Sequence, residues 1–107
     1  MEKKFLDTYN KCIETWGIES EIRLCVEEMS ELTKELMKFF RYGEMECPQE
    51  LKNHIIEEIA DVQNTVDQMQ NIFGEEAVNK VRDEKIGRTN KRIEEHKLGK
   101  WKKEIIV

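Results

Sequence analysis

Two stretches of the sequence decide the fold and the candidate site: Val26-Glu-Glu-Met-Ser-Glu-Leu32 and Ile56-Glu-Glu-Ile-Ala-Asp-Val62. They share the pattern aliphatic–Glu–Glu–apolar–small–acid–aliphatic. On a helix, residues three positions apart lie on neighbouring turns of one face. The pattern therefore predicts one acidic pair on each of two helices: Glu28 with Glu31, and Glu58 with Asp61.

Each acidic pair lies beside an apolar stripe, so two helices that pack through their stripes would bring four carboxylates to one seam. Carboxylates gathered in this way repel one another, which raises a pKa or attracts a cation. A hard divalent ion with oxygen ligands fits best, Mg²⁺ first and Mn²⁺ as an alternative. The chain holds 23 acidic residues among 107, so the spacing alone does not decide between a metal site and two solvated, Glu-rich helix faces.

The composition favours one all-α domain over residues 1–107. Charged and hydrophobic residues each make up 38% of the chain, and there is one Pro, which is typical of long amphipathic helices. We expect an antiparallel bundle of about four helices, and a short tail at 99–107. A few long helices cover more apolar surface when chains associate, so a dimer or tetramer is expected.

The apolar periodicity and the glycines place these helices. The predicted helices span residues 2–15, about 18–41, 49–73 and 75–97. The second and third are long and are joined by a short loop, so we expect them to form an antiparallel hairpin. The two acidic motifs lie at similar distances from that loop and would then be level with each other.

The sequence favours a soluble, cytoplasmic protein that binds neither membranes nor nucleic acids. No apolar run reaches the roughly 18 residues of a membrane span or forms a signal-peptide core. The three cysteines lack a Cys-x-x-Cys spacing, as expected in a reducing compartment. Residues 1–74 carry 16 acidic and 8 basic side chains, which argues against a general nucleic-acid surface.

A basic run follows in the last predicted helix, where Lys85, Arg88 and Arg92 share one face. Beside a Mg²⁺-binding acidic cluster, such a run can hold a polyphosphate, because guanidinium and ammonium groups neutralise phosphate oxygens. On its own, a basic run is more often a solvated face that pairs with nearby Glu residues. Trp16 or Tyr42 can stack on a base, although an aromatic side chain more often packs in a core or an interface.

These motifs together resemble those of the MazG-like, all-α nucleoside triphosphate pyrophosphohydrolases, over roughly residues 10–95. The resemblance rests on Glu27-Glu28-x-x-Glu31 followed after 26 residues by Glu58-x-x-Asp61, on Trp16-Gly17, and on Lys85-x-x-Arg88-x-x-x-Arg92. The chain departs from the family at two positions, with Glu21 where Gln is frequent and Thr89 where Asn is frequent.

The resemblance implies Mg²⁺-dependent cleavage of a (deoxy)nucleoside triphosphate to a monophosphate and pyrophosphate, including house-cleaning of non-standard nucleotides. It also implies a dimer or tetramer with sites built across subunits. The implied metal ligands are Glu28, Glu31, Glu58 and Asp61, with Glu28 and Glu31 also catalytic. Lys85, Arg88 and Arg92 would bind phosphates, and Glu27 and Trp16 would be accessory residues. The alternative function is a non-catalytic helical module for oligomerisation or metal binding.

Overall fold

The computed structural model describes residues 1–43 and 45–99, and the residues in these ranges form four α-helices without strands. The all-α prediction is therefore confirmed, and the predicted bounds are close to those observed. The helices are α1 (Lys3–Trp16), α2 (Ile18–Phe39), α3 (Gln49–Phe73) and α4 (Glu75–Lys97). Most of the predicted tail at 99–107 lies outside the described residues.

The helix α2 ends at Phe39, two residues before the predicted end at Arg41. The last turn tightens there, because the amides of Arg41 and Tyr42 donate to the carbonyls of Lys38 and Phe39, at 3.1 Å each. Bonds of this i→i+3 kind often satisfy the last carbonyls of a helix. The loop between α2 and α3 follows directly.

Two glycines separate helices, as the sequence predicts. Gly17 has φ +87° and its amide donates to the carbonyl of Ile13 at 2.8 Å, which ends α1. Gly74 has φ +119° between α3 and α4. Residues other than glycine are strained at such positive φ angles. These two glycines therefore fix where one helix ends and the next begins.

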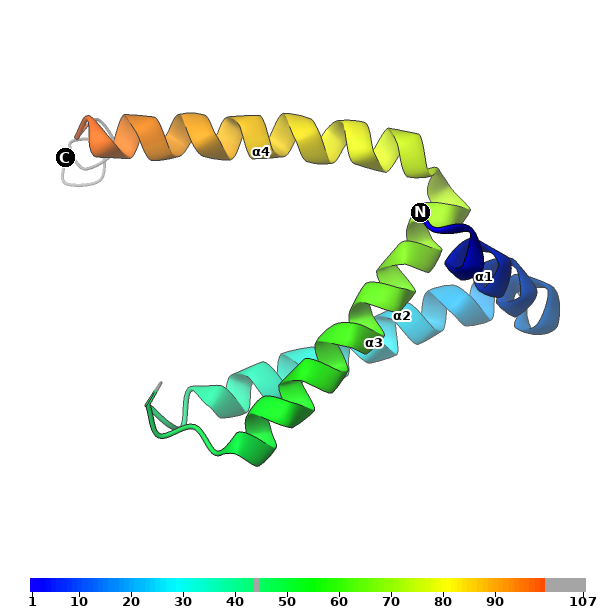
Figure 1. Ribbon diagram of the computed structural model, residues 1–107, viewed down its shortest axis with the longest axis horizontal. Coiled ribbons are helices and arrows are strands. Elements are labelled where there is room, and N and C mark those ends of the chain that lie inside the picture. Colours follow the sequence, from blue (N-terminus) through cyan, green and yellow to red (C-terminus); the bar gives the residue numbers. More distant parts are fainter. Residues whose placement is uncertain (44, 100–107) are drawn as a thin grey trace. The chain divides into compact units, whose positions relative to one another are not determined.

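The chain divides into two compact units, residues 1–73 and residues 74–107. In the first unit, α2 and α3 make the main helix–helix contact, and α1 packs against both (Figure 1). In the second unit, α4 is one continuous helix, and no atom of the described residues lies within 4 Å of the position that a Cβ would take at Gly87. The antiparallel direction of the hairpin and the oligomeric state stay predictions.

The first unit has a thin apolar core, in which the buried apolar residues are Tyr9, Cys25, Cys47 and Leu51. The predicted stripes are only partly covered. Met29 on α2 and Val66 on α3 are 44% and 41% exposed. The apolar faces of α2 and α3 are wider than the area that the packing of three helices covers. Each apolar side chain that stays exposed contributes less to stability than it would if it were buried.

A polar network joins α1, α2 and α3 at the buried Gln68. Its Nε2 donates to the Tyr9 carbonyl oxygen at 2.8 Å and to Glu21 Oε1 at 2.9 Å. Tyr9 in turn donates through its hydroxyl to Asp67 Oδ2 at 3.3 Å. Because Glu21 is 7% exposed, its carboxylate depends on this donor in place of water.

None of the helices in the described ranges is both long enough and apolar enough to cross a membrane. In α4, whose residues are all described, no side chain is buried. Isolated helices gain little stability in water without an apolar face to cover.

We predict that Gln68→Ala destabilises the first unit by about 1–3 kcal/mol, because it removes the amide donor to the buried Glu21 carboxylate and the additional hydrogen bond that Gln68 makes to the Tyr9 carbonyl. The free energy of unfolding, measured by urea titration, tests this. Gln63→Ala is the matched control on an exposed face of the same helix and should change stability by less than about 0.5 kcal/mol. Equal effects of the two substitutions would contradict the structural role of Gln68.

Candidate metal-binding site

Three carboxylates meet where α2 packs on α3. One oxygen from each of Glu28, Glu58 and Asp61 lies within 4.8 Å of the other two, and we call these three residues the acid cluster. Glu28 comes from α2, and the other two residues come from α3. The prediction that α2 and α3 bring acids of both motifs together is thus confirmed for these three side chains.

The helical spacing explains how the backbone places this cluster. Glu58 and Asp61 are three residues apart on α3, so their side chains leave the helix on one face. Glu28 and Glu58 are each half-buried, whereas Asp61 is exposed. The cluster therefore lies at the edge of the helix–helix contact, with one side open to solvent.

Glu58 is the most constrained member of the cluster. Its Oε2 atom is buried and finds no hydrogen-bond partner among the described residues. Burial raises the pKa of Glu58, and the negative charges of Glu28, Asp61, Glu31 and Glu35 raise it further, in that order of importance. A buried carboxylate oxygen without a donor is costly, and a proton or a cation relieves that cost.

This geometry fits a hard divalent cation. Magnesium binds oxygen at about 2.0–2.1 Å, so two oxygens on opposite sides of the ion lie about 4.2 Å apart. At most one pair among three ligands lies on opposite sides of an octahedral ion, and the other pairs lie about 3 Å apart. The cluster oxygens, which lie within 4.8 Å of one another, would therefore draw closer together around a bound ion. All three donors are carboxylates, which suit Mg²⁺ or Mn²⁺ better than soft metals. The residues present thus fit the ion that the sequence predicts.

Glu31, the fourth predicted ligand, lies beside the acid cluster without belonging to the group of oxygens within 4.8 Å. Its side chain is exposed, and its charge still acts on the pKa of Glu58. Glu31 is therefore close enough for electrostatic coupling and free enough to turn toward a bound ion or its water.

The two predicted accessory residues line one cavity away from the acid cluster. Trp16, 64% exposed at the end of α1, and Glu27 on α2 border a hollow of ≈ 440 Å³ together with Leu24 and Arg23. The sequence did not indicate that these two residues share a cavity. Their positions suit contacts with a ligand or with another chain.

Lys85, Arg88 and Arg92 lie on α4, and all three side chains are exposed. The structure describes α4 in a unit of its own. Their predicted role as phosphate-binding residues stays a prediction.

Sequence reasoning missed two buried acids on α2. Glu35 is 8% exposed and accepts from Lys38 Nζ at 3.0 Å, and the 7% exposed Glu21 accepts from Gln68. Glu35 follows Glu28 by seven positions and Glu31 by four, so helical periodicity places it along the same face. This periodicity could have indicated that Glu35 lies near the acid cluster. It does not tell which of the 23 acidic residues are buried.

Comparison of the chain with protein-family models, with curated proteins and with solved structures gave no match. The geometry of the acid cluster therefore carries the functional argument.

We predict that the stability of the metal-free protein falls as pH rises above about 4.5, the ordinary value for a glutamate. The pKa of Glu58 is raised in the folded state, so the folded chain holds this proton more tightly than the unfolded chain does. The stabilisation is therefore complete below the unfolded pKa and is lost as pH rises through the folded one. Urea unfolding at a series of pH values in EDTA measures this slope.

Glu58→Gln should flatten the slope in that window, because the amide does not titrate. Glu57→Gln, at the exposed neighbouring position, should keep it. The assignment to Glu58 fails if both variants retain the wild-type slope.

We also predict that Mg²⁺ stabilises the wild-type protein at pH 7. A ligand that binds only the folded state at a hundred times its dissociation constant adds about 2.7 kcal/mol. The midpoint of thermal unfolding should therefore rise with Mg²⁺ for the wild type and Glu57→Gln, and not for Glu58→Gln. An equal rise in all three proteins would place the ion elsewhere.

Proposed function

We propose that this chain is a Mg²⁺-dependent nucleoside triphosphate pyrophosphohydrolase of the MazG-like kind. One observation supports the proposal above the others: the acid cluster brings three carboxylates together, and a buried Glu58 oxygen has no donor within residues 1–43 and 45–99. Such an arrangement costs stability in the absence of a ligand, which favours a site kept for function over a solvated acidic face.

In this proposal, Glu28, Glu58 and Asp61 hold the ion, and Glu31 completes the set. When bound, Mg²⁺ neutralises phosphate oxygens and lowers the pKa of a coordinated water. Hydrolysis of a phosphoanhydride also needs a group that accepts the proton of the attacking water. Glu31 is our first candidate because it is exposed beside the cluster, and Glu28 is the second.

The substrate side of the proposal rests on the basic run of α4. Lys85, Arg88 and Arg92 would hold the oxygens of the triphosphate, since Arg binds phosphate through paired N–H groups and Lys acts as a compact charge. The products would be a nucleoside monophosphate and pyrophosphate. The preference for standard or non-standard nucleotides is left to a substrate panel.

The second candidate function is a non-catalytic helical module for oligomerisation or metal binding. The exposed apolar side chains on α2 and α3 favour association with further helices. The most exposed of these are Phe73, Ile56, Met37 and Val26. Association also belongs to the enzyme proposal, in which a dimer or tetramer builds the complete site. Catalytic activity therefore separates the two candidates, and association alone does not.

We predict Mg²⁺-dependent release of pyrophosphate from at least one nucleoside triphosphate, tested over the common and modified ribo- and deoxyribonucleotides. Glu58→Gln should lower kcat/KM by about 100-fold or more, because it removes a charged ligand from the ion. Glu57→Gln should retain activity near the wild-type value.

The helical content of each variant, measured by circular dichroism, shows that it is folded. If folded wild-type protein releases no pyrophosphate from any nucleotide with Mg²⁺ or Mn²⁺, the helical module is the better description. If Glu58→Gln is active, Glu58 is not a metal ligand.

A further inference from the structure

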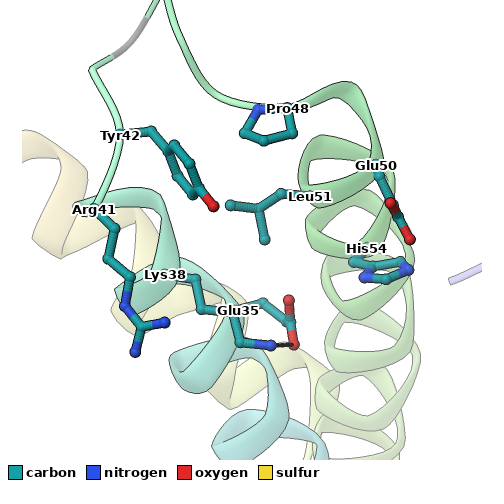
Figure 2. Close-up of a pocket in the computed structure, with 8 residues that line it drawn as sticks. All are labelled: Glu35, Lys38, Arg41, Tyr42, Pro48, Glu50, Leu51 and His54. Carbon is teal, nitrogen blue, oxygen red and sulfur yellow. Dashed lines mark hydrogen bonds and ion pairs between the residues drawn. The ribbon is translucent and has the colours of Figure 1, made fainter.

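A second hollow lies at the loop end of the α2–α3 pair. It encloses ≈ 200 Å³ between the last turns of α2 and the first turns of α3 (Figure 2). We call it the Glu35 cavity, because Glu35 is the buried acid in its wall. Pockets that hold a whole drug-sized ligand measure about 300–1,000 Å³, so this cavity suits one ring of a larger molecule.

Glu35 offers the cavity an unused acceptor. Its Oε1 accepts from Lys38 Nζ at 3.0 Å, while Oε2 is buried and has no hydrogen-bond partner in the described part of the chain. The carboxylate oxygen that is not bonded to Lys38 points toward Leu51 (Figure 2). The bond from Lys38 lowers the pKa of Glu35, so the carboxylate stays ionised and can only accept.

The other walls of the cavity favour a flat, partly apolar ligand. Leu51 comes from the first turn of α3 and Pro48 directly precedes that helix, and the ring of Tyr42 stands opposite Leu51 (Figure 2). Aromatic side chains stack on nucleobases. Among the described residues, the acids and His54 of this cavity form no group close enough to hold a metal ion. A heterocycle with an N–H donor therefore fits the walls better than a cation does.

The distance between the Glu35 cavity and the acid cluster suits a nucleotide that binds at both. Leu51 precedes Glu58 by seven residues on α3, which is about 10 Å along the helix axis. Glu35 is also near enough for its charge to raise the pKa of Glu58. A nucleotide with its phosphates at the acid cluster could thus reach the cavity with its base.

We propose that the Glu35 cavity binds the base of the nucleotide and that Glu35 selects bases with an exocyclic amino group. This inference rests on the proposed function for the identity of the ligand. The amino group of cytosine donates to Glu35 Oε2 and satisfies it. Uracil presents a carbonyl oxygen at the same ring position, which would place two acceptors against each other, and its own donor, N3–H, lies at the neighbouring ring position.

Cytidine and uridine test this directly, because ring position 4 carries an amino group in cytosine and a carbonyl oxygen in uracil, while the adjacent N3 accepts a hydrogen bond in cytosine and donates one in uracil. Titration of ¹⁵N-labelled protein with each nucleoside, in the absence of Mg²⁺, should shift the amide signals of Tyr42, Leu51 and His54. We expect wild-type protein to bind cytidine about tenfold more tightly than uridine, the effect of one hydrogen bond to a charged group.

Glu35→Gln should reverse the preference, since the new amide group can donate to the carbonyl oxygen of uracil. Glu50→Gln changes the exposed acid that lines the same cavity, and it should keep the preference for cytidine. Tyr42→Ala should weaken both nucleosides about equally, by loss of stacking. This variant tests the site even if Glu35→Gln is poorly folded.

Equal binding of cytidine and uridine, an unchanged preference in Glu35→Gln, or shifts only at residues outside the cavity would overturn the inference. If the protein hydrolyses nucleotides but shows any of these results, the inference fails and the pyrophosphohydrolase proposal stands. Glu35-dependent selection by a protein that hydrolyses no nucleotide would support the cavity as a base site and remove the enzyme proposal.

Discussion

The contact between α2 and α3 places like charges beside one another, and this constraint shapes the rest of the first unit. The same packing that buries Cys25 and Leu51 carries Glu28 against Glu58 and Asp61. Burial strengthens the repulsion, because the charges are taken out of water. A helix pair selected for stability alone would carry apolar or oppositely charged residues here. The acid cluster is thus a local cost of the kind that proteins accept at functional sites.

Three acids on these helices show how the surroundings decide what a carboxylate does. Glu21 is buried and receives the Nε2 donor of Gln68, so its charge is used inside the fold. Glu35 has one oxygen on Lys38 and the other without a donor among the described residues. Burial and the negative charges of neighbouring carboxylates raise the pKa of Glu58. The carboxylate of Glu21 is thus used inside the fold, whereas Glu35 and Glu58 each keep an oxygen that can bind a ligand. An acid indicates a binding site when such an oxygen is left over, and its charge alone does not.

The sequence predicted the elements well, because local signals set them. Gly17 and Gly74 adopt positive φ angles where the pattern of apolar residues breaks. The helical spacing of apolar residues between these two glycines is compatible with few arrangements other than two long helices. The meeting of Glu28 with Glu58 was also predictable, since both motifs are at similar distances from one loop. The sequence could not show that Glu35 and Glu21 are buried while Glu31 is exposed. That difference depends on which side of α2 faces α1 and α3, and the spacing of acids alone does not contain it.

The exposed apolar residues bear on how the acid cluster would work. A cation held by three carboxylates at the edge of a helix pair keeps positions open for substrate oxygens, yet the open side also admits water. Enzymes that transfer phosphoryl or nucleotidyl groups exclude bulk water from the reacting atoms, because electrostatic contacts are stronger in a dry site. Met29 lies next to Glu28 in sequence and Ile59 next to Glu58, and both are exposed, at 44% and 39%. Apolar side chains around an acidic site provide a surface that further helices can cover, so association would bury these residues and, under the proposed function, also enclose a bound ion.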